Sequence, residues 1–207
     1  MEKLDLTKKH KNYYWAAAEP EIVQIEPAQF LSIRGKGDPD GEGFAENIQA
    51  LYSTAYAIKF MFKKRDKDFV VAKLEGLWWF DKTNYAGLSI TESSQKVPRS
   101  EWEYRLLIRL PDYVSVADVQ SGIETVLSKK SLTLANNVEF YEMSEGKCVQ
   151  TMHLGPFSTE PESLEKMAVV MKTHNFSQNG LHHEIYLSDF RKTAPEKLKT
   201  ILREPVR

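Results

Sequence analysis

The chain has 207 residues, enough for one large domain or two small fused domains with a substantial buried core. Its 28 basic and 29 acidic side chains give a formal net charge of -1, which argues against a nucleic-acid partner, because such proteins normally carry a basic surface. The single cysteine, Cys148, excludes an internal disulfide framework and fits a reducing compartment. The first residues are polar and no apolar run is as long as a membrane span, so we expect a cytoplasmic protein with no membrane contact.

Residues 1–20 are mostly polar, and we expect them to form a loosely structured N-terminal arm. The arm carries one aromatic cluster, Tyr13, Tyr14 and Trp15. We expect these three rings to pack the arm against the remaining chain. Two short strands are predicted over 21–26 and 29–34, with Pro27 at the turn between them, where its missing N–H is tolerated.

A helix is predicted over about 44–64. Apolar residues recur along it at steps of three and four, which is typical of one buried helix face: Phe44, Ile48, Leu51, Ala55, Ile58 and Phe62. Tyr52 and Tyr56 lie one turn apart beside this stripe, where they are able to reach a neighbouring cleft. Further strands are predicted over 70–80 and 102–110, the second of them closed by a proline.

These elements make up a first half at about residues 21–112. A connector helix follows over 115–130, with Ser115 as its N-terminal cap. The second half covers about residues 136–207. We expect both halves to belong to a single domain that spans 21–207.

The second half repeats the order of the first. Strands over 138–141 and 147–154 are expected to pair with each other across a short turn. A helix begins near Pro161. The capping-box pattern that marks its start comprises Thr159 and Glu162. Strands over 182–187 and 199–203 complete the chain.

The two halves also align residue by residue. Met152, Ser163 and Met167 follow Ile33, Phe44 and Ile48 by the same 119 residues. The segments 76–81 and 184–189 match in the same order, as do 107–111 and 201–205. Each half therefore reads as strand–helix–strand–strand with one added strand in front. This pattern predicts a pseudo-twofold α+β fold with an antiparallel sheet and a central cleft between the halves.

The strand over 182–187 carries the main candidate site. Alternate side chains of a strand point to opposite faces, so His182, Glu184 and Tyr186 share one face and Ile185 lies on the other. A carboxylate between two ring side chains suits a ligand cleft better than a core, although a solvent-facing strand surface is the ordinary alternative. His182 and Glu184 would supply only two metal ligands and no third is visible, so we expect no metal site.

Aromatic residues elsewhere in the chain favour the cleft. Trp78 and Trp79 point to opposite faces of their strand, so one should enter the core and the other the cleft. The alignment of the halves places Trp78 at the position of Tyr186, which makes Trp78 the cleft candidate. The expected ligand-binding residues are Trp78, Trp79, Tyr52, Tyr56, Trp102, Tyr104 and His182. An aromatic wall opposite a carboxylate suits a flat, apolar or cationic ligand.

Other motifs carry less chemistry. The glycine-rich segment 35–43 lacks the order of a phosphate-binding loop and contains acids that would repel phosphate, so we interpret it as a strand-to-helix turn. A serine or cysteine nucleophile elbow is absent from the sequence, and Cys148 lies within a predicted strand. We expect no cofactor.

Several segments, in this order, resemble the stand-alone GyrI-like small-molecule-binding domain proteins of the effector-binding-domain superfamily of transcription regulators. They are Gly35-Lys36-Gly37-Asp38-Pro39, Leu74-Glu75-Gly76-Leu77-Trp78-Trp79, His153-Leu154-Gly155-Pro156-Phe157, His182–Asp189 and Leu198–Val206. The resemblance extends from about residue 20 to the end. Phe157 stands where a tyrosine is common, and we include it among the ligand-binding candidates.

The resemblance implies a duplicated fold with a central ligand cleft. It also implies relatives that are effector-binding domains, multidrug-binding modules, inhibitors of DNA gyrase, or hydrolases of cyclopropane-bearing DNA-alkylating natural products. The acid used in that hydrolysis matches Glu184 by motif. The helix-turn-helix segment of the regulators is not apparent in this sequence, so the chain resembles a sensing or detoxifying domain by itself.

Three functions remain open at this point. The first is binding of apolar, aromatic or cationic small molecules in a cleft around Glu184. The second is ring-opening hydrolysis, in which Glu184 deprotonates a water and Tyr186 stabilises the oxygen charge of the product. The third is a gyrase-inhibitor-like interaction with a protein partner, which the near-neutral charge supports least.

Overall fold

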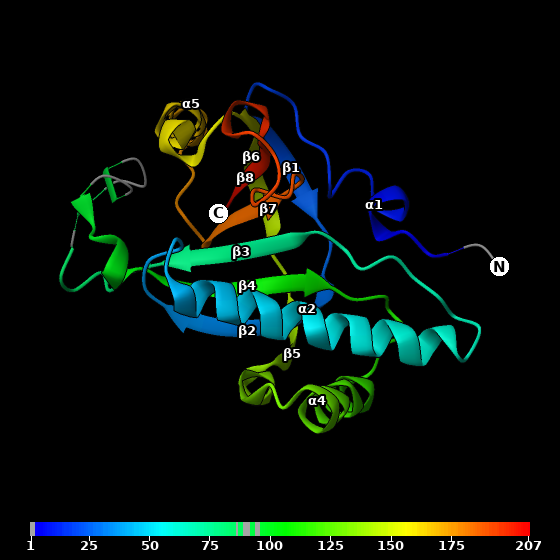
Figure 1. Ribbon diagram of the computed structural model, residues 1–207. Coiled ribbons are helices and arrows are strands. Elements are labelled where there is room, and N and C mark those ends of the chain that lie inside the picture. Colours follow the sequence, from blue (N-terminus) through cyan, green and yellow to red (C-terminus); the bar gives the residue numbers. More distant parts are fainter. Residues whose placement is uncertain (1–2, 86, 89–91, 94–95) are drawn as a thin grey trace.

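The computed structural model describes residues 3–85, 87–88, 92–93 and 96–207. Within this part of the chain, eight strands form one curled sheet (Figure 1). The strands are β1 (Glu21–Ile25), β2 (Ala28–Lys36), β3 (Leu74–Trp79), β4 (Glu103–Arg109), β5 (Glu139–Met143), β6 (Gly146–Leu154), β7 (His182–Tyr186) and β8 (Lys199–Pro205). Their order is β1-β6-β8-β7-β3-β4-β2-β5, and every neighbouring pair is antiparallel. The predicted α+β class with an antiparallel sheet is confirmed.

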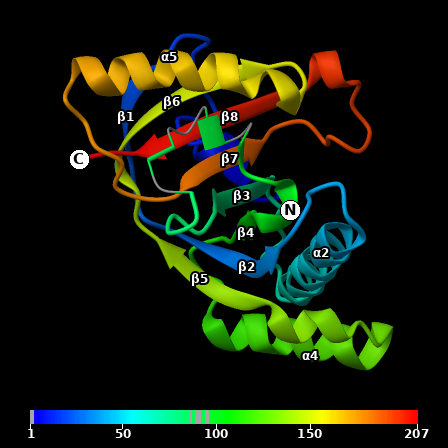
Figure 2. The same cartoon turned by 90° about the vertical axis from the view of Figure 1, so that its left-hand side faces the viewer.

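Helices cover parts of this sheet and its ends. The α-helices of the described chain are α1 (Leu6–Lys9), α2 (Glu42–Lys63), α4 (Val116–Lys130) and α5 (Glu160–Thr173), and the 3-10 helices are η1 (Arg99–Glu101), η2 (Thr133–Asn137), η3 (Phe157–Thr159) and η4 (Pro195–Lys197). The α2 helix packs on β2 and β4, and α5 packs on β6. Figure 2 shows α5 and α4 at opposite ends of the molecule. None of the described helices has both the length and the apolar character needed to cross a bilayer.

The sheet order has the expected twofold pattern. Its centre is the β7–β3 pair, followed outward by β8 and β4, then β6 and β2, then β1 and β5. Each half contributes strand–helix–strand–strand, namely β2-α2-β3-β4 and β6-α5-β7-β8. The strand added in front of each half crosses to the other half, since β1 pairs with β6 and β5 pairs with β2. The two halves are therefore interlocked at both ends of the sheet.

The expected pairing of 138–141 with 147–154 is wrong. In the structure β5 pairs with β2, with Tyr141 opposite Phe30, and β6 pairs with β1 and β8. The first residue of β6, Gly146, has a φ of 69°, which allows the chain to change direction after the turn. The carboxylate of Glu145 accepts hydrogen bonds from His183 and Arg203 at 2.9 and 3.2 Å. These contacts hold the turn against the sheet where the chain passes from β5 to β6.

The helix patterns agree with the structure except at one cap. The whole apolar stripe predicted for the first long helix is buried in α2. Ser115 caps α4 as expected and forms a capping box with Asp118. The capping box predicted from Thr159 and Glu162 is wrong, because the Thr159 hydroxyl instead donates to the carbonyl oxygen of Pro156 at 2.8 Å.

The N-terminal arm lies on the face of the sheet opposite to Glu184. Tyr13 and Tyr14 are buried there, and both hydroxyls donate to the carboxylate of Glu75, at 2.5 and 3.2 Å. Trp15, expected to pack with them, is 59% exposed. The arm is held by these two tyrosines, by buried Leu6 of α1 and by the bridge between Leu4 and Phe69, so the expectation of a loosely structured arm is wrong.

Candidate functional site

The predicted alternation along β7 is present. His182, Glu184 and Tyr186 lie on one face of the strand. The Tyr186 hydroxyl donates to Oε2 of Glu184 at 2.7 Å, and Nε2 of His182 lies 3.3 Å from Oε1 of Glu184. All three side chains are largely buried. Both oxygens of the Glu184 carboxylate thus have a partner from its own strand.

The neighbouring strand β3 extends this arrangement. Trp78 lies opposite His182 in the sheet, and its Nε1 donates to the Tyr186 hydroxyl at 3.0 Å. Gly76 lies opposite Glu184, and a Cβ at this position would come within 2.8 Å of Nε1 of Trp78 and 3.0 Å of the Tyr186 hydroxyl. Glycine at position 76 therefore provides the space in which the tryptophan and the tyrosine meet.

A pocket of about 120 Å³ opens beside these side chains at the C-terminal end of β3. We call it the Glu184 pocket. It is lined by residues from β3, the segment after it, the start of α5 and the start of β7: Trp78, Trp79, Phe80, Lys82, Leu88, Ser93, Trp102, Glu160, Leu164, Gln178, Gly180, Leu181, His182 and Glu184. Both Trp78 and Trp79 reach it, because β3 ends at Trp79. Trp102 packs edge-on against Trp78, with ring centroids 5.8 Å apart.

A second hollow, of about 700 Å³, lies at the other end of the β3–β7 pair. We call it the Tyr52 groove; it is lined by Tyr52, Tyr56 and Tyr186 together with residues of α2, the segment before β3 and the loop after β7. The two hollows correspond under the pseudo-twofold, since each lies between one helix, the start of one central strand and the end of the other. Tyr52 and Tyr56 thus lie in the groove and not in the Glu184 pocket.

Two further candidates support the site without lining either hollow. Tyr104 is buried behind Trp78, with ring centroids 5.5 Å apart, and its hydroxyl accepts a hydrogen bond from the Asn47 amide at 2.9 Å. Phe157 packs edge-on against Tyr186, with ring centroids 5.9 Å apart. These two rings restrict the positions of the side chains that touch the pockets.

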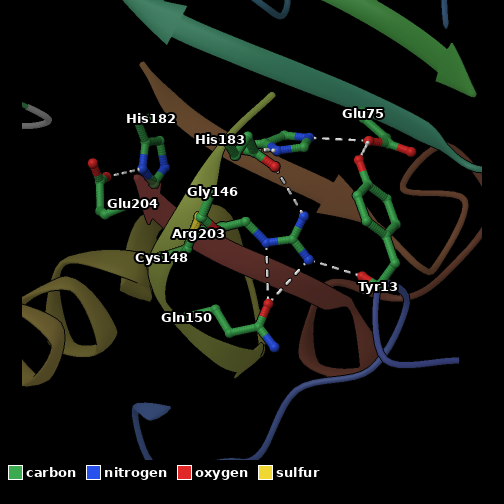
Figure 3. A network of polar contacts seen from close by, with 10 residues as sticks. Tyr13, Glu75, Gly146, Cys148, Gln150, His182, His183, Arg203 and Glu204 are labelled. Carbon is green, nitrogen blue, oxygen red and sulfur yellow. Dashed lines mark hydrogen bonds and ion pairs between the residues drawn. The ribbon is translucent and has the colours of Figure 1, made fainter. Parts of the chain in front are cut away.

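His182 joins two carboxylates. Its Nδ1 is hydrogen bonded to Glu204 of β8, and its Nε2 faces Glu184 (Figure 3 shows the contact with Glu204). Gln178 donates to the second oxygen of Glu204 at 3.2 Å. Burial alone would lower the pKa of His182, but the charges and hydrogen bonds of Glu204 and Glu184 outweigh burial and raise that pKa well above its usual value. The ring is therefore an imidazolium shared by two carboxylates at neutral pH.

Glu160, which no sequence pattern singled out, also lines the pocket. It is the first residue of α5 and is 9% exposed. Its Oε1 has no hydrogen-bond partner among the described residues. Burial raises the pKa of Glu160 well above its usual value, and the charge of Glu184 raises it further, while His182 opposes the shift. Its neighbour on the helix, Glu162, is exposed, and sequence spacing alone does not distinguish the two acids.

The opposite face of β7 carries a separate buried polar cluster (Figure 3). His183 bridges Glu75 and Glu145, at 3.0 and 2.9 Å. Arg203, fully buried, donates to Glu145, to the Gln150 side chain and to the backbone carbonyl of Tyr13. This cluster joins the arm to the sheet, and its members are satisfied by one another, which favours a structural role.

Within the described ranges, no three or more histidine, cysteine, aspartate or glutamate side chains are placed to hold a metal ion together. The Glu184 pocket instead combines indole rings with one paired carboxylate, one imidazolium and one unpaired carboxyl group. Such a mixture suits an organic ligand, with apolar walls for contact area and a few polar groups for orientation.

Comparison with known proteins identifies the family. Residues 18–207 match the GyrI-like small molecule binding domain. The search of curated proteins gave no match. A crystal structure of a conserved protein from Listeria innocua shares 37% identity, with 99% of this chain and 100% of that chain covered and a TM-score of 0.87. A hydrolase from Listeria innocua shares 36% identity, with 99% and 100% covered and a TM-score of 0.85.

A more distant structure, the C-terminal domain of EcmrR, has 10% identity, with 91% of this chain and 97% of that chain covered and a TM-score of 0.57. At this identity the similarity concerns the fold alone. The family match and the two Listeria innocua structures extend over nearly the whole chain. This protein therefore belongs to the GyrI-like small-molecule-binding domain family.

Proposed function

We propose that the protein binds flat aromatic small molecules, and cationic ones preferentially, in the Glu184 pocket. The observation that carries this proposal is a pocket lined by the Glu184 carboxylate together with three indoles, Trp78, Trp79 and Trp102. A cation over an aromatic face gains about 0.5–2 kcal/mol, depending on how far it is desolvated. One imidazolium between Glu184 and Glu204 leaves this group of three with a net negative charge, and Lys82 is exposed at the pocket rim.

Two probes of equal shape test the preference. N-methylquinolinium is a flat cation, and 1-methylnaphthalene is its neutral counterpart. We expect the wild type to bind the cation more tightly than the neutral probe. Glu184→Gln should lower the affinity for the cation by about tenfold, the equivalent of about 1.4 kcal/mol, and change the affinity for the neutral probe by less than twofold. Chemical-shift titrations by NMR would give the affinities.

The matched control is Glu165→Gln, an exposed acid on the same helix as Glu160. It should leave both affinities unchanged. Equal binding of the two probes by the wild type, or an unchanged cation affinity in Glu184→Gln, would contradict the cation preference. Failure of both probes to shift any resonance of the pocket residues would contradict binding at this site.

A second candidate function is ring-opening hydrolysis. It is supported by the hydrolase from Listeria innocua at 36% identity and by a further hydrolase from the same organism at 35%, both over the full chain. In this reaction Glu184 takes a proton from water, and the water oxygen bonds to a strained cyclopropane carbon while the carbon–carbon bond breaks. The electron pair moves to an oxygen of the substrate, which takes up the proton that Glu184 removed from water. Tyr186, whose hydroxyl donates to Glu184 and which lines the Tyr52 groove, orients this carboxylate.

Incubation with a cyclopropane-bearing alkylator, followed by mass spectrometry for addition of one water, separates binding from hydrolysis. If hydrolysis occurs, we expect Glu184→Gln to reduce the rate by about 10²-fold or more, since a positioned general base contributes on this scale. Glu165→Gln again serves as the control. Turnover that equals the protein-free rate would exclude hydrolysis of that probe and leave the binding function standing.

A further inference from the structure

The carboxyl group of Glu160 has no evident structural use. An acid in the first turn of a helix normally stabilises it by accepting backbone N–H groups or by facing its positive end. Oε1 of Glu160 accepts no hydrogen bond from the described residues, and the side chain is buried. Leaving a buried polar group unsatisfied costs about 1–3 kcal/mol. Exposed Glu162 occupies the same first turn and serves the helix without that penalty.

The surroundings of Glu160 determine its charge state. Glu184 and His182 face it from β7, Glu204 lies behind His182 on β8, and Lys82 is exposed at the rim of the pocket. His182 is already shared between the two other glutamates. An ionised Glu160 would therefore place a third negative charge beside Glu184 and Glu204, and no further cation would be there to balance it. The low-energy state is a neutral Glu160 carboxyl group, which carries a proton and is able to donate a hydrogen bond.

We propose that Glu160 is a ligand-contacting residue whose protonated carboxyl group donates a hydrogen bond to a carbonyl-type oxygen on a flat aromatic ligand. This inference rests on the proposed function, because it places the donor in the Glu184 pocket. A ligand oxygen would supply the partner that Glu160 lacks within the protein. Ligands with such an oxygen are then selected over equally shaped hydrocarbons, while Glu184 continues to favour positive charge.

A pair of small probes isolates this contact. 1-Indanone and indane have the same ring system, and only the ketone carries an acceptor oxygen. One hydrogen bond contributes about 1 kcal/mol, so we expect the wild type to prefer 1-indanone by about fivefold. Glu160→Leu removes the donor and should reduce the preference to less than twofold. Glu160→Gln keeps an N–H donor and should therefore retain the preference for 1-indanone. Glu165→Gln is the control and should also retain it.

The pH dependence gives a readout that a purely structural role would not produce. In the wild type the preference for 1-indanone should be lost as pH rises and Glu160 ionises, because a carboxylate cannot donate. In Glu160→Gln the preference should stay constant over the same range. Glu184, His182, Glu204 and Lys82 are present in both proteins, so the two proteins differ only at position 160.

Infrared spectroscopy tests the protonation without any probe. At neutral pH the wild type should show the carbonyl absorption of a protonated carboxyl group, and Glu160→Gln should lack it. Absence of this band from the wild type, equal binding of the two probes, or an unchanged preference in Glu160→Leu would each overturn the inference. Failure of both probes to bind the wild type, with the band present, would instead overturn the proposed function of the pocket.

Discussion

A single side-chain group, the Tyr186 hydroxyl, connects the two central strands. It donates to Glu184 and accepts from Trp78, so one oxygen atom satisfies polar groups on both β7 and β3. The ring is buried and packs edge-on against Phe157 and Phe190. Water cannot easily replace the hydroxyl at such a position. The geometry of the Glu184 pocket therefore depends on this atom.

We predict that Tyr186→Phe lowers the free energy of unfolding by about 1–3 kcal/mol, because the indole N–H and one carboxylate oxygen lose a buried partner. Urea denaturation followed by tryptophan fluorescence measures the loss. Tyr56→Phe is the matched control, since Tyr56 is 45% exposed, and it should change stability by less than about 0.5 kcal/mol. Equal effects of the two substitutions would show that the hydroxyl bridge contributes nothing.

Glu145 provides the second prediction for a single residue. Burial alone would raise its pKa, but His183 and Arg203 outweigh burial and lower that pKa from the usual 4.5 to about 2. A carboxyl group with a lowered pKa contributes stability above pH 4.5, and this contribution is lost as pH falls toward 2. At neutral pH the contribution is on the order of 3 kcal/mol.

We therefore predict that Glu145→Gln destabilises the protein by about 3 kcal/mol at pH 7 and reduces the fall in stability between pH 4.5 and pH 2. Urea titrations at a series of pH values would show both effects. Glu142→Gln, an exposed acid on β5, should leave the stability and its pH dependence unchanged. If the stability of Glu145→Gln were lower by the same amount at every pH, and fell between pH 4.5 and pH 2 as steeply as in the wild type, the lowered pKa of Glu145 would be contradicted.

Among the contacts between secondary-structure elements, the packing of α4 on α2 depends on one glycine. Gly122 is buried in α4, and a Cβ there would lie 2.6 Å from Cγ1 of Ile58 and 3.5 Å from Cγ2 of Thr54. The two helices approach so closely because position 122 has no side chain. Gly43, near the start of α2, has no neighbouring atom within 4 Å of a Cβ.

The same substitution should therefore have opposite effects at these two positions. In Gly122→Ala, the clash costs about 1–3 kcal/mol and exceeds the gain in helix propensity of about 1 kcal/mol, so the net result is destabilisation. Gly43→Ala has only the gain and should stabilise by up to about 1 kcal/mol. Thermal unfolding of the two variants beside the wild type measures both signs. A stabilising Gly122→Ala would mean that Ile58 moves aside freely.

The exchange of β1 and β5 links the halves at the level of the whole molecule. Each added strand is hydrogen bonded to the half to which it does not belong in sequence, β1 to β6 and β5 to β2. The central β3–β7 pair joins the halves a third time. The sheet is thus continuous, and neither half keeps all of its strand partners without the other.

We predict that fragments 1–131 and 132–207 are each unfolded or aggregated alone and form the native structure when mixed. Near-UV circular dichroism and NMR spectra of the separate and mixed fragments would test this. As a control, a shortened fragment 145–207 lacks β5 and should complement fragment 1–131 much less well, because one edge of β2 stays unpaired. A native spectrum from either fragment alone would show that the halves fold independently.

The predictions that agree with the structure came from the spacing of side chains along single strands and helices. The common face of His182, Glu184 and Tyr186 follows from the two-residue period of a strand, and the buried face of α2 follows from the helical period. The matching order of segments in the two halves predicted the repeated unit, which the symmetric strand order confirms. Each of these features is set by neighbours along the chain, so one sequence is sufficient to predict it.

Only the tertiary structure decided which segments meet. The short turn before Gly146 is compatible with a hairpin, yet β5 pairs with β2, more than a hundred residues away, and Glu145 in the turn is bound by Arg203 and His183. Glu160 and Glu204 reach His182 and Glu184 from elements that no local pattern connects. Tyr52 and Tyr56 line the Tyr52 groove and not the Glu184 pocket, which likewise no local pattern predicts. Periodicity determines which way a side chain points, whereas its neighbours depend on packing between distant segments.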